Sequence, residues 1–504
     1  MKIRRLLERP YWQLAVVSGI MIGASYPPLK LGVIVYLAFI PLIEIVTSAR
    51  PGKAACLAFL AGLISNTIAL YWLAFNSGAT FWVVFLSLVG AVIYLSAQWS
   101  ILASVVAWFH SRTGKGLLMF PFLWVTMEYF QSFGLLAFPW ISLATTQADY
   151  LAPIQLVEFT GIYGMTFWII LLNTQLYRLL TSPAPLLPRL RIWTAVVLVL
   201  PWIYGYGRML SFPAQSSNEV ELSIAVVQPN MGPHEKWDRS KRQWVFEVLD
   251  SLYVEAAQKG VDMVVWPESA VPTYLRRDRF RRKFIQNRVE EFGVPLFTGA
   301  LDFDRKDGFL KHYNSIFMFN VDGSLETYYK IHLVPLAEYN PLDAQVSLTE
   351  NLSFGHYNPG TRYTDFFLKE SQFAGVICYE SSFPRLVHRL VSQGARFLVV
   401  VVNDGWFGNT SEPYQHVALS RLRAVEHRMP VLRSANTGIS VHVDKAGRFK
   451  SKLDLDERGI IYAGFSPSDG LTFYGRFGNL FAFLITLVTF LGGFWICEIG
   501  RAHV

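Results

Sequence analysis

Residues 373–384 read FAGVICYESSFP, an apolar run that ends at a cysteine and is followed at once by polar residues and a proline. A short apolar run bounded by turn-forming residues is typical of a strand buried on one or both faces. Proline is favoured in the first turn of a helix, so a helix is expected to begin near Pro384. The segment therefore predicts a buried strand that turns sharply into a helix, with Cys378 at the turn.

The same alternation extends through the surrounding sequence. Short runs rich in β-branched residues are separated by polar stretches with helical periodicity. The expected strands are 222–230, 262–269, 294–303, 314–320, 373–380, 397–404 and 429–436. The expected helices are 238–259, 276–292, 384–393 and 414–428. Alternating strands and helices predict a layered α/β domain.

The rest of the chain is too apolar for a soluble protein. Apolar residues make up 52% and charged residues only 16%, whereas soluble domains have roughly 25% charged residues. About 20 apolar residues are needed to cross a bilayer as a helix. The expected spans are the eight apolar runs at about 11–27, 30–48, 54–75, 80–109, 116–134, 160–177, 191–207 and 478–497. The fold class is therefore an α-helical membrane bundle of eight spans plus an α/β domain.

The net charge of +8 indicates the orientation of these spans. Lys and Arg outnumber Asp and Glu by 13 to 5 in residues 1–208, but the counts are 31 to 31 in residues 209–477 and 1 to 1 in residues 478–504. Positive residues are retained on the cytoplasmic side, and with the N-terminus inside only Lys30 and Arg208 fall in short outer segments. We expect seven spans in the first segment, an outer domain in the second, and an eighth span with a cytoplasmic tail in the third.

Two carboxylates lie inside the predicted spans, Glu44 and Glu128. An ionisable residue within a membrane is a candidate functional group. A structural role at a helix end explains Glu44 better, whereas a functional role and a hydrogen-bonded structural role are equally consistent with Glu128.

Cys378 is the one cysteine of the predicted outer domain, because Cys56 and Cys497 lie in predicted spans. A lone cysteine on a strand is more often a small buried apolar residue than a nucleophile. Here the turn into a helix would aim backbone N–H groups at the thiol, stabilise the thiolate and lower its pKa. Cys378 is therefore a candidate nucleophile.

A nucleophile needs a base and an electrostatic partner. Glu268 follows a proline at the end of one predicted strand, and Lys330 lies in another segment of polar residues, Tyr329–His332. Glu268 could take the thiol proton and Lys330 could stabilise an oxyanion. Glu268 could equally be a carboxylate at the start of a helix, and Lys330 could equally be a surface charge. Spacing in the sequence alone does not show that the two side chains lie close together.

Three segments together resemble the nitrilase superfamily: VVWPES at 264–269, YYKIHLVPLAEY at 328–339 and GVICYESSFP at 375–384. The resemblance implies an αββα sandwich in which Glu268, Lys330 and Cys378 form the catalytic set. It also implies that Glu338 is a second carboxylate near the site.

The predicted spans on both sides narrow the resemblance to the bacterial apolipoprotein N-acyltransferases, a membrane-bound family. The segments QPN at 228–230, NDGWFG at 403–408 and SANTG at 434–438 fit the same family. By this resemblance Tyr379, Glu380, Glu338 and Trp237 would shape or gate the pocket.

The resemblance also implies the reaction. Cys378 would attack the sn-1 ester of a phospholipid, preferably phosphatidylethanolamine, and the acyl chain would pass from the thioester to the N-terminal α-amine of a diacylglyceryl-cysteine apolipoprotein. The expected location is the bacterial inner membrane with the catalytic domain on the periplasmic side. We expect a monomer that needs no cofactor. We also expect no metal, because the histidines of the domain lack the spacing of metal ligands.

Two other classes of protein share parts of this pattern. A membrane-tethered amidase of the nitrilase type would have the same Glu, Lys and Cys, but eight spans are a large anchor for it. A transporter with an outer binding domain would be expected to have several ionisable residues at mid-membrane, where here only Glu128 stands out.

Overall fold

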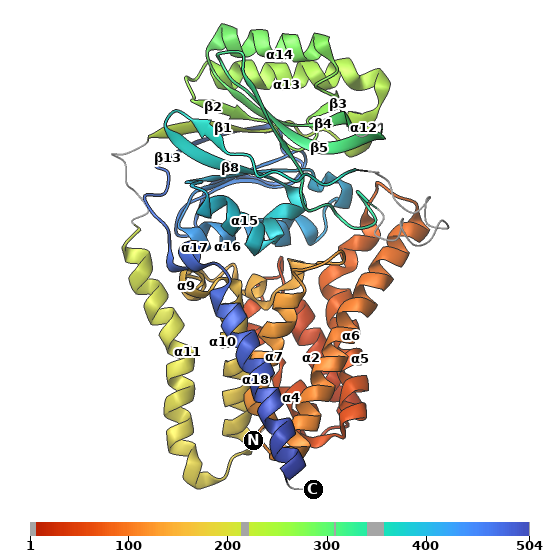
Figure 1. Ribbon diagram of the computed structural model, residues 1–504, viewed down its shortest axis with the longest axis vertical. Helices are drawn as coiled ribbons and strands as arrows, with labels where there is room; N and C mark the ends of the chain where they lie inside the picture. The colour runs from red at the N-terminus through yellow and green to blue at the C-terminus, as the bar shows by residue number, and fades with distance from the viewer. Residues whose placement is uncertain (1–6, 213–220, 307–308, 340–356, 503–504) are drawn as a thin grey trace. The chain divides into compact units, whose positions relative to one another are not determined.

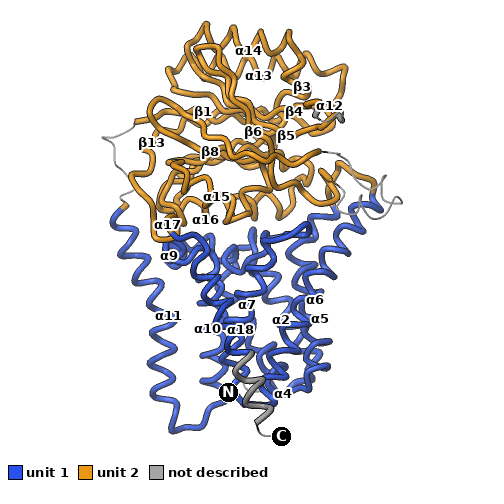
Figure 2. Tube along the Cα trace, viewed as in Figure 1, with its two compact units in different colours: residues 1–74, 81–211, 477–504 blue, residues 75–80, 212–476 orange. Residues whose placement is uncertain are grey.

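The computed structural model describes residues 7–212, 221–306, 309–339 and 357–502. The chain divides into two compact units, shown in blue and orange in Figure 2. Residues 1–74, 81–211 and 477–504 form a helical unit, and residues 75–80 and 212–476 form an α/β unit.

Every predicted span contains helix. The principal helices of the helical unit are α2 (Tyr11–Ala24), α3 (Val35–Ala38), α4 (Ile40–Ser48), α5 (Pro51–Leu70), α6 (Phe81–Thr113), α7 (Gly116–Phe130), α8 (Leu151–Ile154), α9 (Val157–Thr160), α10 (Ile162–Thr181), α11 (Leu187–Leu210) and α18 (Leu480–Ala502). Short 3-10 helices join them: η1 (Gly32–Ile34), η2 (Tyr71–Phe75), η3 (Pro139–Ile141), η4 (Leu143–Gln147) and η5 (Ala184–Leu186).

Fewer of these helices reach membrane-spanning length than the eight predicted spans. Among the described residues, three are long and apolar enough to cross a bilayer, at Pro51–Phe75, Phe81–Thr113 and Ala184–Leu210. A fourth is added if Leu151–Thr160 and Ile162–Thr181, which meet at a bend of 120°, count as one span. The other apolar helices are shorter, with 10 to 17 residues, at Tyr11–Ala24, Gly32–Ser48, Gly116–Phe130 and, for the part of α18 whose side chains are described, Leu480–Gly493. Among the described residues, every predicted span thus contains helix, but fewer helices than predicted have spanning length.

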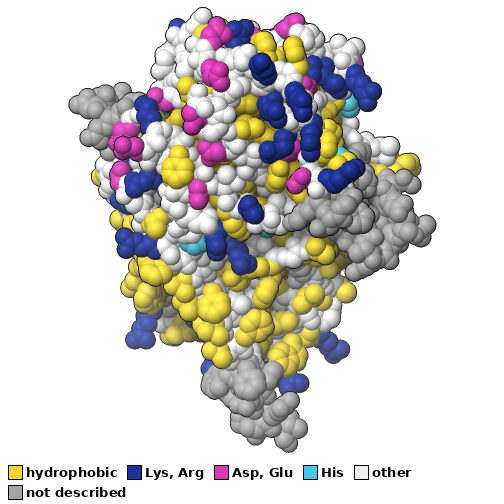
Figure 3. All heavy atoms as spheres, turned by 45° about the horizontal axis from the view of Figure 1, so that its top comes forward, with side chains coloured by type: hydrophobic (Ala, Val, Ile, Leu, Met, Phe, Trp, Pro, Cys, Tyr) yellow, Lys and Arg dark blue, Asp and Glu magenta, His cyan; other side chains and the backbone are white. Residues whose placement is uncertain are grey.

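The outer surface of the helical unit is apolar. Large hydrophobic side chains are exposed on α6 and α11, including Trp82, Ile101, Trp193 and Ile203. Figure 3 shows hydrophobic side chains gathered over much of the helical surface in that view. An exposed apolar surface of this extent marks a membrane or protein interface, and with the long apolar helices it identifies a membrane protein.

The predicted span at 30–48 is broken at Phe39, between α3 and α4. Asn173 of α10 compensates for the break: its Oδ1 accepts a hydrogen bond from the Phe39 N–H at 3.0 Å, and its Nδ2 donates to the Val35 carbonyl at 2.8 Å. Broken helices are tolerated in an apolar environment only where such partners satisfy the freed backbone groups.

Glu128 of α7 is a buried hub in the helical unit. Its carboxylate accepts hydrogen bonds from the Leu143 N–H at 3.0 Å and from the Ser142 and Thr166 hydroxyls, both at 2.7 Å. The Trp124 indole donates a fourth at 3.2 Å. These contacts favour the structural explanation of Glu128.

The α/β unit contains two sheets. Strands β13-β1-β2-β4-β5-β6 form one sheet, with β3 paired to β4, and strands β12-β11-β10-β9-β8-β7 form the other. The first sheet consists of β1 (Leu222–Gln228), β2 (Met263–Val265), β3 (Val271–Tyr274), β4 (Leu296–Lys306), β5 (Phe309–Phe319), β6 (Leu325–Tyr329) and β13 (Gly459–Phe465). The second consists of β7 (Phe366–Leu368), β8 (Ser371–Ile377), β9 (Leu398–Val402), β10 (Val431–Ala435), β11 (Ser440–Val443) and β12 (Phe449–Leu453).

Helices cover the outer faces of the two sheets, so that the unit has four layers, helix, sheet, sheet and helix (Figure 1). The helices and 3-10 turns are α12 (Pro233–Trp237), η6 (Arg239–Lys241), α13 (Arg242–Ala257), α14 (Arg279–Phe292), η8 (Cys378–Ser382), α15 (Pro384–Ser392), η9 (Asp404–Phe407), α16 (Glu412–His427) and α17 (Phe473–Phe477). All seven predicted strands and all four predicted helices are present.

The alternation of side chains along β1 explains the layering. Ile224 and Val226 pack into the core between the two sheets, whereas Ala225 and Val227 pack into the core under α13 and α14. Successive side chains of a strand point to opposite faces, and a strand apolar on both faces is covered on both.

The strand directions bring two of the predicted site residues to one edge. β2 runs parallel to β4. β5 is antiparallel to β4, and β6 is antiparallel to β5, so β6 runs in the same direction as β2. Glu268 follows β2 and Lys330 follows β6, which places both beyond the carboxyl ends of the first sheet. Cys378 follows β8, which runs parallel to β9 in the second sheet.

Gly375→Ala tests the close packing of the sheets. A Cβ at Gly375 of β8 would lie 2.5 Å from the Phe297 ring of β4 and 3.2 Å from Ile316. Overpacking of a buried core costs roughly 1–3 kcal/mol, so a lower midpoint of thermal unfolding is expected. Gly470→Ala is the control, because nothing lies within 4 Å of its Cβ position. Equal midpoints for the two variants would contradict the packing.

Candidate functional site

Glu268 lies in a tight turn after β2, beside the neighbouring strand. It is 7% exposed, and its Oε1 accepts a hydrogen bond from Asn314 Nδ2 at 2.7 Å. A Cβ on Gly299 of β4 would lie 2.6 Å from the Glu268 Cα. The turn can approach β4 only because position 299 has no side chain, so the carboxylate is held near the edge of the sheet.

Lys330 is buried between two carboxylates. Its Nζ lies 2.8 Å from Glu338 Oε2 and 3.7 Å from Glu268 Oε1, and only 1% of the residue is exposed. Burial acts to lower the pKa of Lys330, but the charges of Glu338 and Glu268 outweigh it and raise the pKa. The side chain therefore stays an ammonium, as an electrostatic role requires.

Glu338 and Asn314 complete this charged cluster. Glu338 accepts from Lys330 Nζ, from Asn314 Nδ2 at 2.9 Å and from the Val334 N–H at 2.8 Å. Asn314 thus donates to both Glu268 and Glu338 through one amide nitrogen. The sequence reasoning missed Asn314, although it begins the otherwise apolar predicted strand 314–320 and a polar side chain there was a visible signal.

Cys378 occupies a strained turn between β8 and α15. Its backbone φ is +52°, a left-handed conformation that residues with a side chain rarely adopt. The residue is partly exposed, whereas the preceding strand β8 is buried from Phe373 to Ile377. Strained residues of this kind cluster at functional sites, and the strain here aims the side chain of a potential nucleophile.

The thiol differs in one respect from the prediction. We expected the turn to lower the pKa of Cys378, but burial, followed by the negative charge of Glu268, raises the pKa well above the ordinary value, and Lys330 offsets only part of this. The physical reason is that burial disfavours a thiolate and nearby carboxylates repel it. The resting side chain is therefore a thiol that needs a base.

Glu380 joins the two segments that carry Lys330 and Cys378. Its Oε1 accepts from the Ile331 N–H at 2.7 Å, and its Oε2 accepts from the Ile377 N–H at 2.9 Å. Burial raises the pKa of Glu380 to about 7, although its hydrogen bonds act to lower it. Glu380 is fully buried, and its carboxyl group links the segment after the first sheet to a strand of the second.

The aromatic residues predicted to support the site lie in different surroundings. Tyr379 is 4% exposed, and its ring meets the Phe383 ring edge-on with centroids 5.1 Å apart. Trp237 at the end of α12 is 36% exposed. Tyr379 is thus part of the packed turn, whereas Trp237 presents a partly open indole.

Lys236, which the sequence reasoning missed, precedes this tryptophan and is fully buried. Its Nζ donates to the Glu268 carbonyl at 3.4 Å. Burial lowers the pKa of Lys236 to about 8, although the Glu268 charge acts to raise it. A buried lysine in a short polar helix has no distinctive pattern in a sequence, which is why it was not singled out.

One group of side chains has the composition of a metal site. Ligand atoms of Cys378, Asp404 and His416 lie within 4.8 Å of one another. Each type of atom can bind zinc, but Asp404 pairs with Arg433, and His416 Nδ1 lies 3.0 Å from Asp404 Oδ1. The donor atoms of Asp404 and His416 are thus engaged within the protein, and the group fits a hydrogen-bonded network better than a metal centre.

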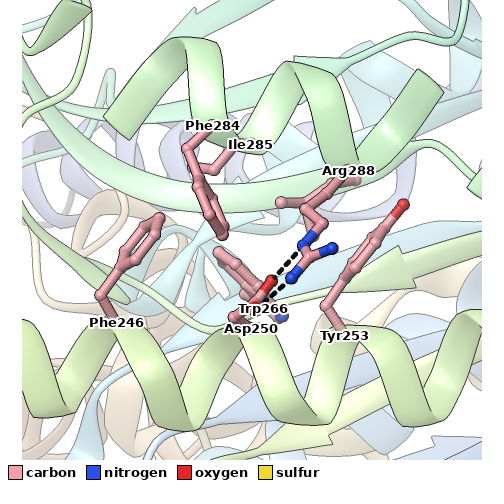
Figure 4. Close-up of a pocket in the computed structure, with 8 residues that line it drawn as sticks. Phe246, Asp250, Tyr253, Trp266, Phe284, Ile285 and Arg288 are labelled. Carbon is pink, nitrogen blue, oxygen red and sulfur yellow. Dashed lines mark hydrogen bonds and ion pairs between the residues drawn. The ribbon is translucent and has the colours of Figure 1, made fainter. Parts of the chain in front are cut away.

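A hollow of about 10 Å³ lies away from these residues, between α13, α14 and the first sheet (Figure 4). Phe246 and Trp266 line it, and Arg288 pairs with Asp250 at its rim at 3.0 Å. The buried Trp266 Nε1 has no partner among the described residues. The volume suits about one water molecule, so the hollow is too small for an organic substrate.

Comparisons with known proteins match both units. The family model of the apolipoprotein N-acyltransferase N-terminal domain matches residues 18–175, and that of carbon-nitrogen hydrolase matches residues 223–470. A solved amidase of the nitrilase superfamily from Nesterenkonia sp. AN1 aligns with a TM-score of 0.40 and 18% identity over 53% of this chain and 96% of that one.

Curated relatives match over nearly the whole length. The apolipoprotein N-acyltransferase of Geobacter metallireducens is 31% identical over 99% of this chain and 95% of the relative. That of Rickettsia bellii is 30% identical over 87% of this chain and 88% of the relative. With the apolar helices and the nitrilase-like α/β unit, these matches show that the chain belongs to the apolipoprotein N-acyltransferase family.

Proposed function

We propose that this protein transfers an acyl chain from the sn-1 position of a phospholipid, preferably phosphatidylethanolamine, through a thioester on Cys378. The acceptor is the N-terminal α-amine of a diacylglyceryl-cysteine apolipoprotein. The observation that carries the proposal is the set of buried Glu268, buried Lys330 and partly exposed Cys378 in a chain that matches the family over both units. Its relatives bear the name of this activity.

The first half-reaction forms the acyl-enzyme. Glu268 takes the thiol proton as Cys378 Sγ attacks the ester carbonyl, and the ammonium of Lys330 stabilises the tetrahedral oxyanion with a backbone N–H of the turn. The C–O bond then breaks, the alkoxide takes the proton from Glu268, and lysophospholipid leaves. The high thiol pKa supports this role for Glu268, because the thiol does not ionise unaided.

In the second half-reaction the acyl chain leaves Cys378 for a new nucleophile, the α-amine, through the same kinds of step. The free α-amine attacks the thioester carbonyl and gives up a proton to Glu268, the C–S bond breaks, and the thiolate of Cys378 is protonated again. Two half-reactions at one nucleophile give ping-pong kinetics. The remaining supporting residues have structural tasks: Glu338 holds Lys330, Glu380 and Tyr379 fix the turn, and Trp237 lines the approach.

The membrane location has a physical basis. Both substrates carry long acyl chains, and exposing each CH₂ group to water costs roughly 0.8 kcal/mol. We infer seven spans in residues 1–208, a periplasmic catalytic domain in residues 209–477 and an eighth span with a cytoplasmic tail in residues 478–504, in the inner membrane, as a monomer. The bias of Lys and Arg toward the inner segments supports this orientation.

Incubation with phosphatidylethanolamine is expected to add one acyl mass to the peptide that contains Cys378, as measured by mass spectrometry. Cys378→Ala should lose both this adduct and acyl transfer to a diacylglyceryl peptide. Cys56→Ala is the matched control, because Cys56 is exposed on α5, outside the α/β unit. Full activity in Cys378→Ala would overturn the mechanism, and an adduct formed only with small amides would favour an amidase.

Glu268→Gln tests two roles of Glu268, as the general base and as a negative charge that raises the thiol pKa. Loss of a general base slows a reaction roughly 10²- to 10⁴-fold, so thioester formation should fall within this range. Because the Glu268 charge raises the thiol pKa, the pH midpoint of Cys378 alkylation by iodoacetamide should shift lower in the same variant. Glu247→Gln on the exposed face of α13 is the control. Thioester formation at the normal rate would show that another group is the base.

A reporter fused after residue 220 tests the orientation. We expect an alkaline phosphatase fusion to be active and a green fluorescent protein fusion at the same point to be dark, because the first folds and the second fails to fold in the periplasm. The opposite pattern would contradict the orientation that we infer from the charge bias.

A further inference from the structure

The backbone carbonyl of Cys378 is held by two side chains. His416 Nε2 on α16 lies 3.0 Å from this oxygen and 2.9 Å from Ser381 Oγ. The Ser381 hydroxyl itself donates to the same carbonyl at 3.0 Å. These contacts fix the peptide group that follows the strained Cys378 residue.

The other nitrogen of the His416 ring faces carboxylates. Nδ1 lies 3.0 Å from Asp404 Oδ1 and 3.4 Å from Glu412 Oε1, and the ring is fully buried. A carbonyl oxygen and an ionised carboxylate can only accept hydrogen bonds. Protons on both ring nitrogens satisfy the contacts with the Cys378 carbonyl and the Asp404 carboxylate, and the side chain is then an imidazolium.

The charges around the ring are consistent with this state. Burial acts to raise the pKa of Asp404, but Arg433 and His416 outweigh it and lower the pKa, so Asp404 stays ionised. Burial and Arg433 act to lower the pKa of His416, but Asp404 and Glu412 outweigh them and raise it. The groups that face the ring are Asp404 of η9, Glu412 of α16, Arg433 of β10 and Cys378 of η8.

We propose that His416 is a positioning residue of the acyl-transfer reaction, in which its imidazolium holds the Cys378 carbonyl and so fixes both the nucleophile and the N–H of the same peptide group. That N–H belongs to Tyr379 and lies next to the thiol in the chain. Hydrogen bonding at the carbonyl of a peptide polarises its N–H, which strengthens the N–H as an oxyanion donor. The catalytic consequence rests on the function proposed above, whereas the protonation state of the ring does not.

Ring protonation can be measured without any substrate. In the intact protein labelled with [15N]histidine, long-range 1H–15N correlation spectra should show His416 with both nitrogens protonated at pH 7.5, and His416→Gln assigns its signals. The matched control is His442 of β11, which is 4% exposed and whose pKa burial lowers to about 4, so it should be neutral. A singly protonated His416 at pH 7.5 would overturn the proposal.

Kinetics test the positioning role. His416→Gln keeps one neutral donor but loses the charge, so kcat for thioester formation should fall roughly 10- to 100-fold, less than for loss of an oxyanion donor itself. KM for phospholipid should stay unchanged, because the His416 side chain is fully buried and contacts the backbone of Cys378. Ser381→Ala should lower kcat further only weakly in the His416→Gln background, since both side chains act on one carbonyl.

His442→Gln is the control for loss of a buried histidine in the same unit, and its kcat should match that of the wild type. A kcat for His416→Gln within twofold of the wild type would contradict the proposal, as would an equal loss in His442→Gln. If His416→Gln does not fold, substitution of the other histidines in turn assigns the His416 signals by elimination, and the spectra of the wild-type protein then decide the protonation state. Absence of any acyl adduct on wild-type Cys378 would instead refute the proposed function alone.

Discussion

The site depends on the hydrogen bonds that the buried carboxylate of Glu380 accepts from two backbone N–H groups. The carboxylate binds the backbone N–H of Ile331, which follows Lys330, and the backbone N–H of Ile377, which precedes Cys378. One segment follows the first sheet and the other belongs to the second, so this side chain ties the two sheets together beside the site. Leaving buried N–H groups without an acceptor costs about 1–3 kcal/mol each, and this cost keeps the two segments in register.

Around Glu380 the charged side chains of the site balance one another. Lys330 is held between Glu338 and Glu268, and the same carboxylates keep it an ammonium. The Cys378 thiol stays neutral instead, because burial and the charge of Glu268 raise its pKa. In the mechanism that we propose, a neutral thiol beside a carboxylate and a fixed ammonium does not react until a carbonyl enters, and the same three groups then serve both half-reactions.

Much of the α/β unit could be predicted from the sequence because its strands are apolar on both faces and its helices are periodic. Two of the strands that were not predicted, β12 and β6, are of a different kind. β12, with the sequence FKSKL, alternates charged and apolar residues at a sheet edge, and β6, with the sequence LETYY, is polar along much of its length. Such strands are stabilised by pairing with a neighbour, and pairing leaves no local pattern.

Site residues that lie in recognisable sequence motifs could be predicted. Residues that contact the site from distant parts of the chain could not. Glu268, Lys330 and Cys378 each follow a strand, and the observed directions of β2 and β6 place the first two at one edge. Asn314 and Lys236 contact Glu268 from distant parts of the chain. The error in the thiol pKa has the same origin, because burial and the charge of a distant carboxylate are properties of the folded unit.

The central claim is that one acyl chain passes through Cys378 on its way from lipid to protein. The most direct measurement isolates the acyl-enzyme, removes phospholipid, and mixes it rapidly with a diacylglyceryl-cysteine peptide. We expect the thioester to disappear as the acylated peptide appears, one for one, at a rate at least equal to steady-state turnover. A thioester that persists, or that decays more slowly than the enzyme turns over, would contradict it.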